Sequence, residues 1–284
     1  MTPASATGPR QIGVVITTYN SPRWLEKVLW GYEHQEDSEF TAIVADDGSG
    51  AETAALIEHF RARGRLRLVH EWQADEGFRK CRILNQAIAN TDCDYLIFTD
   101  GDCIPEPGLI RTHRQLAAPG RFLSGGYIKL TLPVSESLGE EDIASGACFD
   151  RDWLVARGQP RSHKLWKLLQ APWKKRWLNR LTPAAASWNG MNSSTWTADL
   201  RAVNGFNEDM QYGGLDRELG ERLWHYGHHS RQIRYSTVCL HLDHPRGYAK
   251  PEIWARNRAI REAVKREKRW WNPNGILKQA TPDG

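Results

Sequence analysis

A short apolar run in this chain ends in two closely spaced carboxylates. Tyr95-Leu96-Ile97-Phe98 is followed directly by Thr99-Asp100-Gly101-Asp102-Cys103. The run is typical of a strand buried in a parallel sheet, and the carboxyl ends of such strands form the edge where α/β folds bind ligands. Asp100 and Asp102 are two residues apart, so both can face one side. Their oxygens suit Mg²⁺ or Mn²⁺, although a solvated surface turn produces the same pattern.

The segments before this strand alternate between two hydrophobic patterns. Strand-like runs occupy residues 12–16, 41–45 and 66–70, and helix-like patterns occupy residues 23–34, 52–63 and 79–89. The first two runs end in turn residues, as the run at 95–98 does. Strands that alternate with helices predict an α/β fold with a mostly parallel central sheet and right-handed crossovers.

Several motifs, in a fixed order, resemble glycosyltransferase family 2, which has the GT-A fold. They are residues 14–20, Asp46-Asp47-Gly48-Ser49, residues 77–88, Asp100-Gly101-Asp102, residues 205–208 and residues 213–223. The later ones are most similar to the C-terminal region of galactosyltransferase-type and chondroitin-polymerase-type members. The resemblance spans residues 12–246 and implies a nucleotide-sugar-dependent glycosyltransferase that inverts the anomeric centre.

The resemblance and the composition of the segments between its motifs together predict how the chain is organised. We expect a flexible N-terminus over 1–11, a catalytic domain over 12–250, and a C-terminal helix and tail over 251–284. Within the catalytic domain, we expect a nucleotide-binding part at about 12–130, a basic helical insertion at about 153–183 and an acceptor-side part at about 185–250.

The resemblance implies a metal site with one ligand from the C-terminal region. Asp100, Asp102 and His244 would hold Mn²⁺ or Mg²⁺, and Asp100 would also lie against the nucleotide. His241 is close enough in sequence to take the place of His244. Each histidine has a structural interpretation as well.

The resemblance places Asp47 against the uridine of a UDP-sugar donor. A carboxylate accepts strong hydrogen bonds from ribose hydroxyls or a base N–H, whereas the alternative is an ordinary surface turn. Other nucleotide contacts are expected from the end of the first strand, at Thr17, Tyr19 and Asn20. Arg79 and Lys80 are positioned either to approach phosphate or to form the polar face of a helix.

Asp216 matches the catalytic aspartate of the family. A carboxylate near the acceptor hydroxyl can take its proton as a general base. Many relatives have Glu-Asp where this chain has Leu215-Asp216, so the acid that precedes the base is missing here. Asp216 also suits the first turn of a helix over 217–226, because acidic side chains stabilise helix N-termini.

Residues 187–194 resemble the family's loop around the donor sugar. Gly190 would allow a close approach, Asn192 would offer both a donor and an acceptor to sugar hydroxyls, and Trp188 would stack on the sugar. Gly214 belongs to the matching acceptor-side motif. Tryptophan is also a common core residue, so Trp188 has that second interpretation.

A basic, tryptophan-rich segment is not explained by this chemistry. Residues 153–198 contain eight Lys or Arg and six Trp but no acidic residue, and large apolar residues recur there every four positions from 165 to 181. This pattern predicts an amphipathic helix, kinked at Pro172, that lies on an anionic membrane. The proposed contacts are Trp173, Lys174, Lys175 and Trp177. There are two alternatives: a helix that packs on the core and exposes a basic face to solvent, and an RNA-binding patch.

Composition narrows the remaining classes. No stretch is apolar enough to span a bilayer and residues 1–10 lack a signal peptide's apolar core, so we expect a cytoplasmic protein, peripheral on the inner face of the cytoplasmic membrane. Five scattered cysteines predict no disulfide framework. A net charge of +4 is too small to indicate a nucleic-acid partner. The expected acceptor is a lipid-linked or cell-surface glycan.

Two other functional classes remain open at this stage. A sugar nucleotidyltransferase would share the sheet and the metal, but it requires a Gly-rich phosphate loop after the first strand, and residues 17–22 are not such a loop. A non-catalytic, membrane-associated glycan-binding scaffold would lack metal-dependent nucleotide binding.

Overall fold

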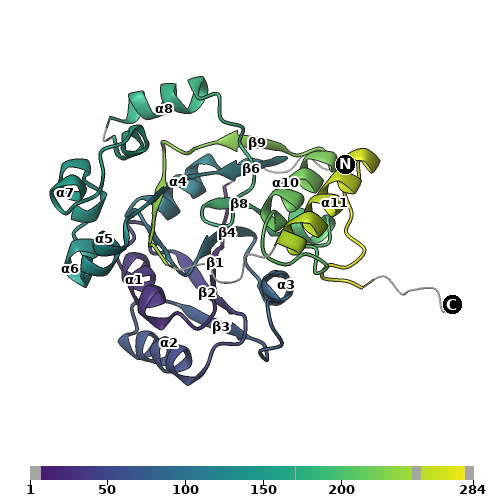
Figure 1. Cartoon of the computed structure of the whole chain (residues 1–284), viewed down its shortest axis with the longest axis horizontal. Coiled ribbons are helices and arrows are strands. Elements are labelled where there is room, and N and C mark those ends of the chain that lie inside the picture. The colour runs from purple at the N-terminus through teal and green to yellow at the C-terminus, as the bar shows by residue number, and fades with distance from the viewer. Residues whose placement is uncertain (1–7, 170, 245–250, 279–284) are drawn as a thin grey trace.

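A seven-stranded mixed sheet lies at the centre of the molecule (Figure 1), and its strand order is β3-β2-β1-β4-β8-β6-β9. The computed structural model describes residues 8–169, 171–244 and 251–278. The strands are β1 (Ile12–Thr18), β2 (Phe40–Asp46), β3 (Leu68–Trp72), β4 (Tyr95–Asp100), β6 (Arg121–Ser124), β8 (Ser193–Trp196) and β9 (His229–Gln232). β3, β2, β1 and β4 are parallel, and β8 is antiparallel to both β4 and β6. The predicted α/β class with a mostly parallel sheet is confirmed.

Alternate side chains of the central strands enter two different hydrophobic clusters. On β1, Val14 and Ile16 belong to a cluster with α1 (Pro22–Glu33) and α2 (Ala51–Arg63). Val15 belongs to a cluster on the other face with α3 (Lys80–Asn90), α9 (Thr197–Ala202) and α10 (Leu215–His225). The period-two alternation of a strand therefore produces a sheet with helices on both faces.

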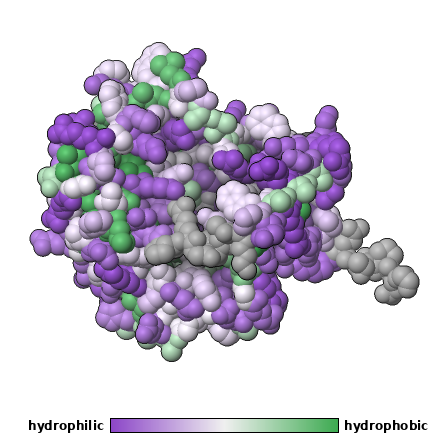
Figure 2. Space-filling model, viewed as in Figure 1, coloured by the Kyte–Doolittle hydropathy of each residue, from purple (hydrophilic) through white to green (hydrophobic). Residues whose placement is uncertain are grey.

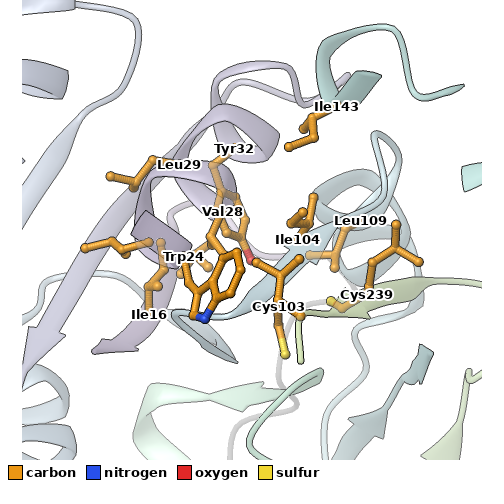
Figure 3. Packing of buried hydrophobic residues seen from close by; sticks show 14 of the residues in the cluster. Ile16, Trp24, Val28, Leu29, Tyr32, Cys103, Ile104, Leu109, Ile143 and Cys239 are labelled. Carbon is orange, nitrogen blue, oxygen red and sulfur yellow. The ribbon is translucent and has the colours of Figure 1, made fainter. Parts of the chain in front are cut away.

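Helix α1 shows why these segments fold where they do. Pro22 begins the helix, where its missing N–H is not needed. Trp24, Val28 and Tyr32 recur four residues apart and form one buried face. Figure 3 shows this face packed towards Ile104, which lies in a second, smaller sheet.

The second sheet joins distant parts of the chain beside the central one. It contains β5 (Cys103–Pro105), β10 (Val238–His241) and β7 (Gly126–Lys129), in that order. His241 is paired with Cys103 on one side and with Lys129 on the other. The sheet thus brings the C-terminal histidines to the residues that follow β4. Helix α4 (Leu109–Leu116) follows β5.

Residues 132–181 form a series of short helices at one side of the molecule (Figure 1). They are α5 (Leu132–Ser137), α6 (Glu140–Ala144), η1 (Ala147–Phe149), α7 (Arg151–Ala156), η2 (His163–Leu168) and α8 (Pro172–Leu181). The prediction of one long kinked helix through this segment was wrong. Residues 163–168 form a 3₁₀ helix in which Leu165 and Leu168 are buried in the core, so the apolar stripe is divided between core and surface.

Helix α8 carries the exposed part of that stripe. Trp173 is 64 %, Trp177 57 % and Leu181 69 % exposed. In Figure 2, hydrophobic and weakly polar side chains adjoin hydrophilic ones at the top of the molecule, where Figure 1 places α8. The surface in this region is therefore both apolar and basic.

The chain closes with α11 (Pro251–Glu267), which packs against α10. No helix in the described ranges is long and apolar enough to cross a bilayer. Parts of three predicted segments lie outside the described residues. They are positions 1–7 of the flexible N-terminus, positions 245–250 of the acceptor-side part, and positions 279–284 of the C-terminal tail.

A buried ion pair fixes α10 to the rest of the molecule. Arg222 and Glu218 are almost fully buried and are joined by hydrogen bonds of 2.8 and 2.9 Å. The same guanidinium donates to the carbonyl oxygens of Val203 and Gly205, both at 2.6 Å. All of these groups have lost water and satisfy one another.

We predict that Arg222→Ala destabilises the protein by about 3–5 kcal/mol, because Glu218 would be left as an uncompensated buried charge. Chemical denaturation monitored by circular dichroism measures this loss. The matched control is Arg217→Ala on the same helix, which removes an exposed guanidinium. Equal unfolding midpoints for the two variants would contradict the anchoring role.

Candidate functional site

One pocket of about 1660 Å³ opens at the carboxyl edge of β1, β2 and β4. Its wall is completed by residues 185–191, the start of α10, and residues of α11. Most of the predicted site residues line this pocket: Thr17, Tyr19, Asn20, Asp47, Asp100, Asp102, Trp188, Gly190, Gly214, Asp216, His241 and His244. The structure therefore brings together motifs that are up to 227 positions apart.

Asp100 is held by two neighbours. The Nζ atom of Lys80 lies 2.5 Å from Asp100 Oδ1, and the hydroxyl of Thr17 donates to the same oxygen at 2.9 Å. Burial favours the neutral amine, but the carboxylates of Asp100, Asp216 and Asp102 outweigh it and raise the pKa of Lys80. Lys80 is therefore a fixed cation among the acidic side chains.

Asp102 faces two imidazoles. Its Oδ2 lies 2.9 Å from His244 Nε2 and 3.8 Å from His241 Nε2, and the two imidazole rings are stacked. Asp102, His241 and His244 each offer one possible metal-ligand atom, and these three atoms lie within 4.8 Å of one another. His241 Nδ1 lies 2.8 Å from the Leu242 carbonyl oxygen, which favours a proton on Nδ1 and leaves Nε2 as the ligand atom.

The charge balance at Asp102 favours the ionised carboxylate. Burial raises the pKa of Asp102, but the hydrogen bond from His244 and the two nearby imidazoles lower it below its usual range. A carboxylate with two imidazole nitrogens fits a divalent cation such as Mn²⁺ better than Mg²⁺, which prefers oxygen ligands. Both histidines predicted as alternatives converge on this point.

Asp47 lies at the end of β2 with its carboxylate turned towards the loop before α3. Its Oδ1 accepts a hydrogen bond from Gln73 Nε2 at 2.5 Å, and Oδ2 accepts one from the Arg79 backbone N–H at 2.9 Å. Burial raises its pKa despite these bonds. Asp47 is buried, so it faces the pocket as a fixed acceptor rather than as a mobile surface charge.

The end of β1 supplies the other predicted nucleotide contacts. Tyr19 is half exposed and donates its phenolic hydroxyl to Asp75 Oδ2 at 2.9 Å. The side-chain oxygen of Asn20 accepts from the Gly50 backbone N–H at 3.0 Å. These bonds join the loop after β1 to the loops after β2 and β3 at the pocket edge.

Asp216 occupies the first turn of α10, behind Gly214, whose φ of 87° lies in the left-handed region that favours glycine. Its Oδ1 is buried and has no hydrogen-bond partner within the described ranges. A Cβ atom at Gly190 would lie 3.0 Å from that oxygen, so the glycine makes room for the carboxylate. Burial raises the pKa of Asp216 to about 6, with Lys80 lowering it and Asp100 raising it.

Two residues expected to touch the donor sugar are placed differently. Asn192 is fully buried, and its side chain bonds to His113 Nε2 at 2.8 Å and to the Gly126 carbonyl oxygen at 2.9 Å. The Trp188 indole is buried against the rings of Phe98 and Phe122. The proposed sugar hydrogen bonds of Asn192 and the stacking of Trp188 were therefore wrong, because both side chains serve the core beneath the pocket.

Other lining residues were missed by the sequence analysis. Arg234 and Lys129 line the pocket near β7, and Trp254, Arg258 and Arg261 line it from α11. Nothing local in the sequence marks them, because their position depends on how β7 and α11 pack. Lys80, for which a phosphate contact and a helix surface were both left open, lines the pocket and pairs with Asp100.

The comparisons with known proteins agree with this arrangement. Residues 13–121 match the model of glycosyl transferase family 2. This matched part of the chain is similar to glycosyl transferase family 2. It is 37 % identical over 269 residues to the uncharacterized glycosyltransferase YfnE of Bacillus subtilis, covering 82 % of this chain and 64 % of YfnE.

Two further relatives have specific names. Validoxylamine A glucosyltransferase of Streptomyces hygroscopicus is 28 % identical over 76 % of this chain and 52 % of its own length. Chondroitin synthase of Escherichia coli is 27 % identical over 82 % of this chain and 35 % of its own length. The chain thus spans about half to two thirds of the first curated relatives it matches.

Solved structures confirm the GT-A fold. TarS 1–349 of Staphylococcus aureus, in complex with UDP-GlcNAc, matches with a TM-score of 0.58 at 16 % identity, covering 91 % of this chain and 69 % of that one. Mannosyltransferase PcManGT of Pyrobaculum calidifontis, in complex with GDP-Man and Mn²⁺, matches with a TM-score of 0.55 at 17 % identity, covering 86 % and 59 %.

Proposed function

We propose that this chain transfers a sugar from a UDP-sugar to a hydroxyl group of a glycan acceptor, with inversion of the anomeric centre. The observation that carries the proposal is that Asp102, His241 and His244 face the same pocket as Asp216. Asp102 and the two histidines suit a divalent cation, and Asp216 suits a proton transfer. The family match, and the nucleotide sugars named with TarS and PcManGT, support this proposal.

The residues present fit a divalent cation. Asp102 and His244 would hold Mn²⁺ or Mg²⁺, with His241 beside them. Asp100 would contribute its Oδ2, because Lys80 pairs with its Oδ1. Such an ion, when bound, stabilises the negative charge that develops on the departing diphosphate. Lys80 keeps Asp100 in position whether or not an ion is present.

The nucleoside would lie over the ends of β1 and β2. Asp47 would accept a hydrogen bond from the nucleoside, and Thr17, Tyr19 and Asn20 would form the surrounding wall. Gly190 and Gly214 would allow the donor sugar and the acceptor to approach closely at the start of α10. Since the Asp47 carboxylate is already fixed by Gln73 and the Arg79 backbone, it needs no reorganisation on binding.

Asp216 would act as the general base. It takes the proton of the acceptor hydroxyl while that oxygen forms a bond to the anomeric carbon. The bond from this carbon to the diphosphate oxygen breaks with its electron pair, and UDP leaves. Because Oδ1 has no hydrogen-bond partner in the described part of the chain, it is able to accept that proton.

We predict that UDP binds only when the metal is present. In a calorimetric titration, the wild-type protein binds UDP in Mn²⁺ and loses this binding in EDTA, and CDP and GDP compete poorly. Asp102→Asn reduces the affinity for UDP, whereas Asp209→Asn, an exposed acid outside the pocket, leaves it unchanged. Binding of UDP without the metal would contradict the assigned metal site. Tighter binding of GDP than of UDP would indicate that the donor is a GDP-sugar.

We predict that Asp216→Asn lowers the rate of transfer to acceptor or water by about 100-fold or more, the usual contribution of a general base. Release of UDP from the UDP-sugar measures this rate, and UDP affinity should stay unchanged. In the wild-type protein the rate should fall as the pH drops through about 6, because Asp216, whose pKa burial raises to about 6, is then protonated and cannot accept a proton. Loss of UDP affinity in the variant would exclude the role of base.

We further propose that α8 attaches the protein to the inner face of the cytoplasmic membrane, where its acceptor is a lipid-linked or cell-surface glycan such as lipopolysaccharide. Trp173 and Trp177 are exposed beside Lys174 and Lys175. Aromatic and basic side chains on one short helix match an interfacial site on anionic lipid. Each basic residue near such a surface contributes roughly 1 kcal/mol.

We predict that replacing Trp173, Trp177, Lys174 and Lys175 together by serine abolishes co-sedimentation with vesicles of phosphatidylglycerol and phosphatidylcholine. Arg65→Ser/Arg67→Ser is the charge-matched control, because it removes two exposed cations next to α2, away from α8. Retained co-sedimentation of the quadruple variant would overturn this proposal. Binding of RNA in place of vesicles would assign the patch to nucleic acid.

A further inference from the structure

A second group of charged side chains lies at the pocket wall formed by β7 and the segment before β10. Arg234 and Lys129 line the pocket there, and Lys167 of η2 lies near Arg234. Arg234 and Lys167 form no ion pair with a carboxylate within the described ranges, although this protein pairs many of its other cations. None of these three residues has a role in the scheme proposed above.

The backbone fixes this group in place. Lys167 donates from Nζ to the Tyr127 carbonyl oxygen at 2.6 Å and lies over the Tyr127 ring. The carbonyl oxygen of Arg234 packs directly against Gly126, next to Tyr127 on β7. Both residues are thus held against β7, at the neighbouring residues Gly126 and Tyr127.

This arrangement is electrostatically unfavourable without an anion. Burial, together with the neighbouring charges of Arg234 and Lys164, lowers the pKa of Lys167 to about 8. Arg234 Nε is buried and has no hydrogen-bond partner in the described part of the chain. Arg234 and Lys167 are thus neighbouring cations without a carboxylate partner in the described ranges, which is typical of a site for an anion.

The position of the group indicates which anion it would meet. Asn179 of α8 donates to the Ser236 hydroxyl at 2.8 Å and accepts from the Tyr235 backbone N–H at 2.9 Å, directly after Arg234. On the other side, β7 pairs with β10 so that Lys129 lies opposite His241. The group therefore lies between the exposed face of α8 and the candidate metal site.

We propose that Arg234 and Lys167, with Lys129, bind a phosphate group of the acceptor, which makes the acceptor a phosphorylated glycan or glycolipid. This inference rests on the proposed transfer function. A guanidinium and an ammonium bind phosphate oxygens through charge-assisted hydrogen bonds. An acceptor that enters along α8 would be held by its phosphate while its hydroxyl reaches Asp216.

The test uses glucose 1-phosphate as a soluble phosphate monoester. Calorimetric titrations are made with the protein alone and with the protein saturated with UDP and Mn²⁺. The wild-type protein binds the probe in both states. Arg234→Ala and Lys167→Ala each weaken that binding about tenfold or more, the effect of losing one charge-assisted contact. Their affinity for UDP stays unchanged, and Arg234→Lys retains part of the phosphate binding.

The control is Arg161→Ala, which removes an exposed cation from the same acid-free segment and should bind the probe as the wild type does. Circular dichroism verifies that all variants fold. Equal binding of the probe by Arg234→Ala and the wild type would overturn the proposal. A parallel loss of UDP affinity would overturn it too, by assigning the cations to the donor diphosphate.

A second arm separates an acceptor phosphate from a membrane headgroup. Phosphatidylcholine vesicles with and without phosphatidic acid are used in place of the soluble probe. Binding that depends on Arg234 with these vesicles, but is absent with glucose 1-phosphate, would overturn the acceptor assignment in favour of a lipid headgroup. If the wild type fails to bind UDP, the proposed transfer function fails, and the titration without UDP still decides whether Arg234 binds phosphate.

Discussion

The parallel register of β1 with its two neighbours determines where the chemistry of this protein lies. Thr18 is paired with Asp46 on β2, and Thr17 is paired with Asp100 on β4, so three strands end at the same level. The polar residues that follow each strand must therefore share one edge of the sheet. Every other part of the pocket is an addition to this edge, and a shift of any strand by one residue would turn its carboxylate to the other face.

Concentrating carboxylates at one edge creates repulsion that the fold has to offset. The structure does this with groups from outside the central strands. Lys80 from α3 pairs with Asp100, and the imidazole of His244 lies against Asp102. Asp216 receives the least compensation, since its Oδ1 has no hydrogen-bond partner in the described ranges and its pKa rises to about 6. The carboxylate that is least stabilised as an anion is thus the one suited to accept a proton.

The sequence predicted the elements whose signal is local. The buried runs of β1, β2 and β4 carry continuous apolar residues, and the order of the motifs gave the resemblance to the family whose model matches residues 13–121. β8 was not predicted, because Ser193, Ser194 and Thr195 have no apolar pattern. Their burial depends on partners distant in the sequence, including the bonds of the Ser194 hydroxyl to Tyr95 at 2.8 Å and His113 at 2.6 Å. Local periodicity contains no information about such partners.

The same limit explains the errors at the site. Asn192 carries the right groups for a sugar, but those groups are used by His113 and Gly126, which a one-dimensional pattern does not reveal. The convergence of His241 and His244 on Asp102 likewise depends on β10 pairing with β5. Residue types near the end of a buried strand are therefore a good guide to the chemistry, whereas the choice among neighbouring polar residues requires the packing.

The charges that line the pocket are separated in space, and this separation bears on how a substrate would be oriented. The acidic residues follow the central strands, while Lys129 and Arg234 lie at the β7 side and Arg258 and Arg261 on α11. The Arg261 guanidinium on α11 forms an ion pair with Glu221 at 2.5 Å, so its charge is partly neutralised. In the proposed reaction a divalent cation would hold the donor diphosphate at the acidic end, and an acceptor that itself carries negative charge would be repelled by the carboxylates there and attracted to the cations at the β7 side. Under the proposed function, this separation of charge would orient the two substrates, with the donor at the acidic edge and the phosphate of the acceptor at the β7 side.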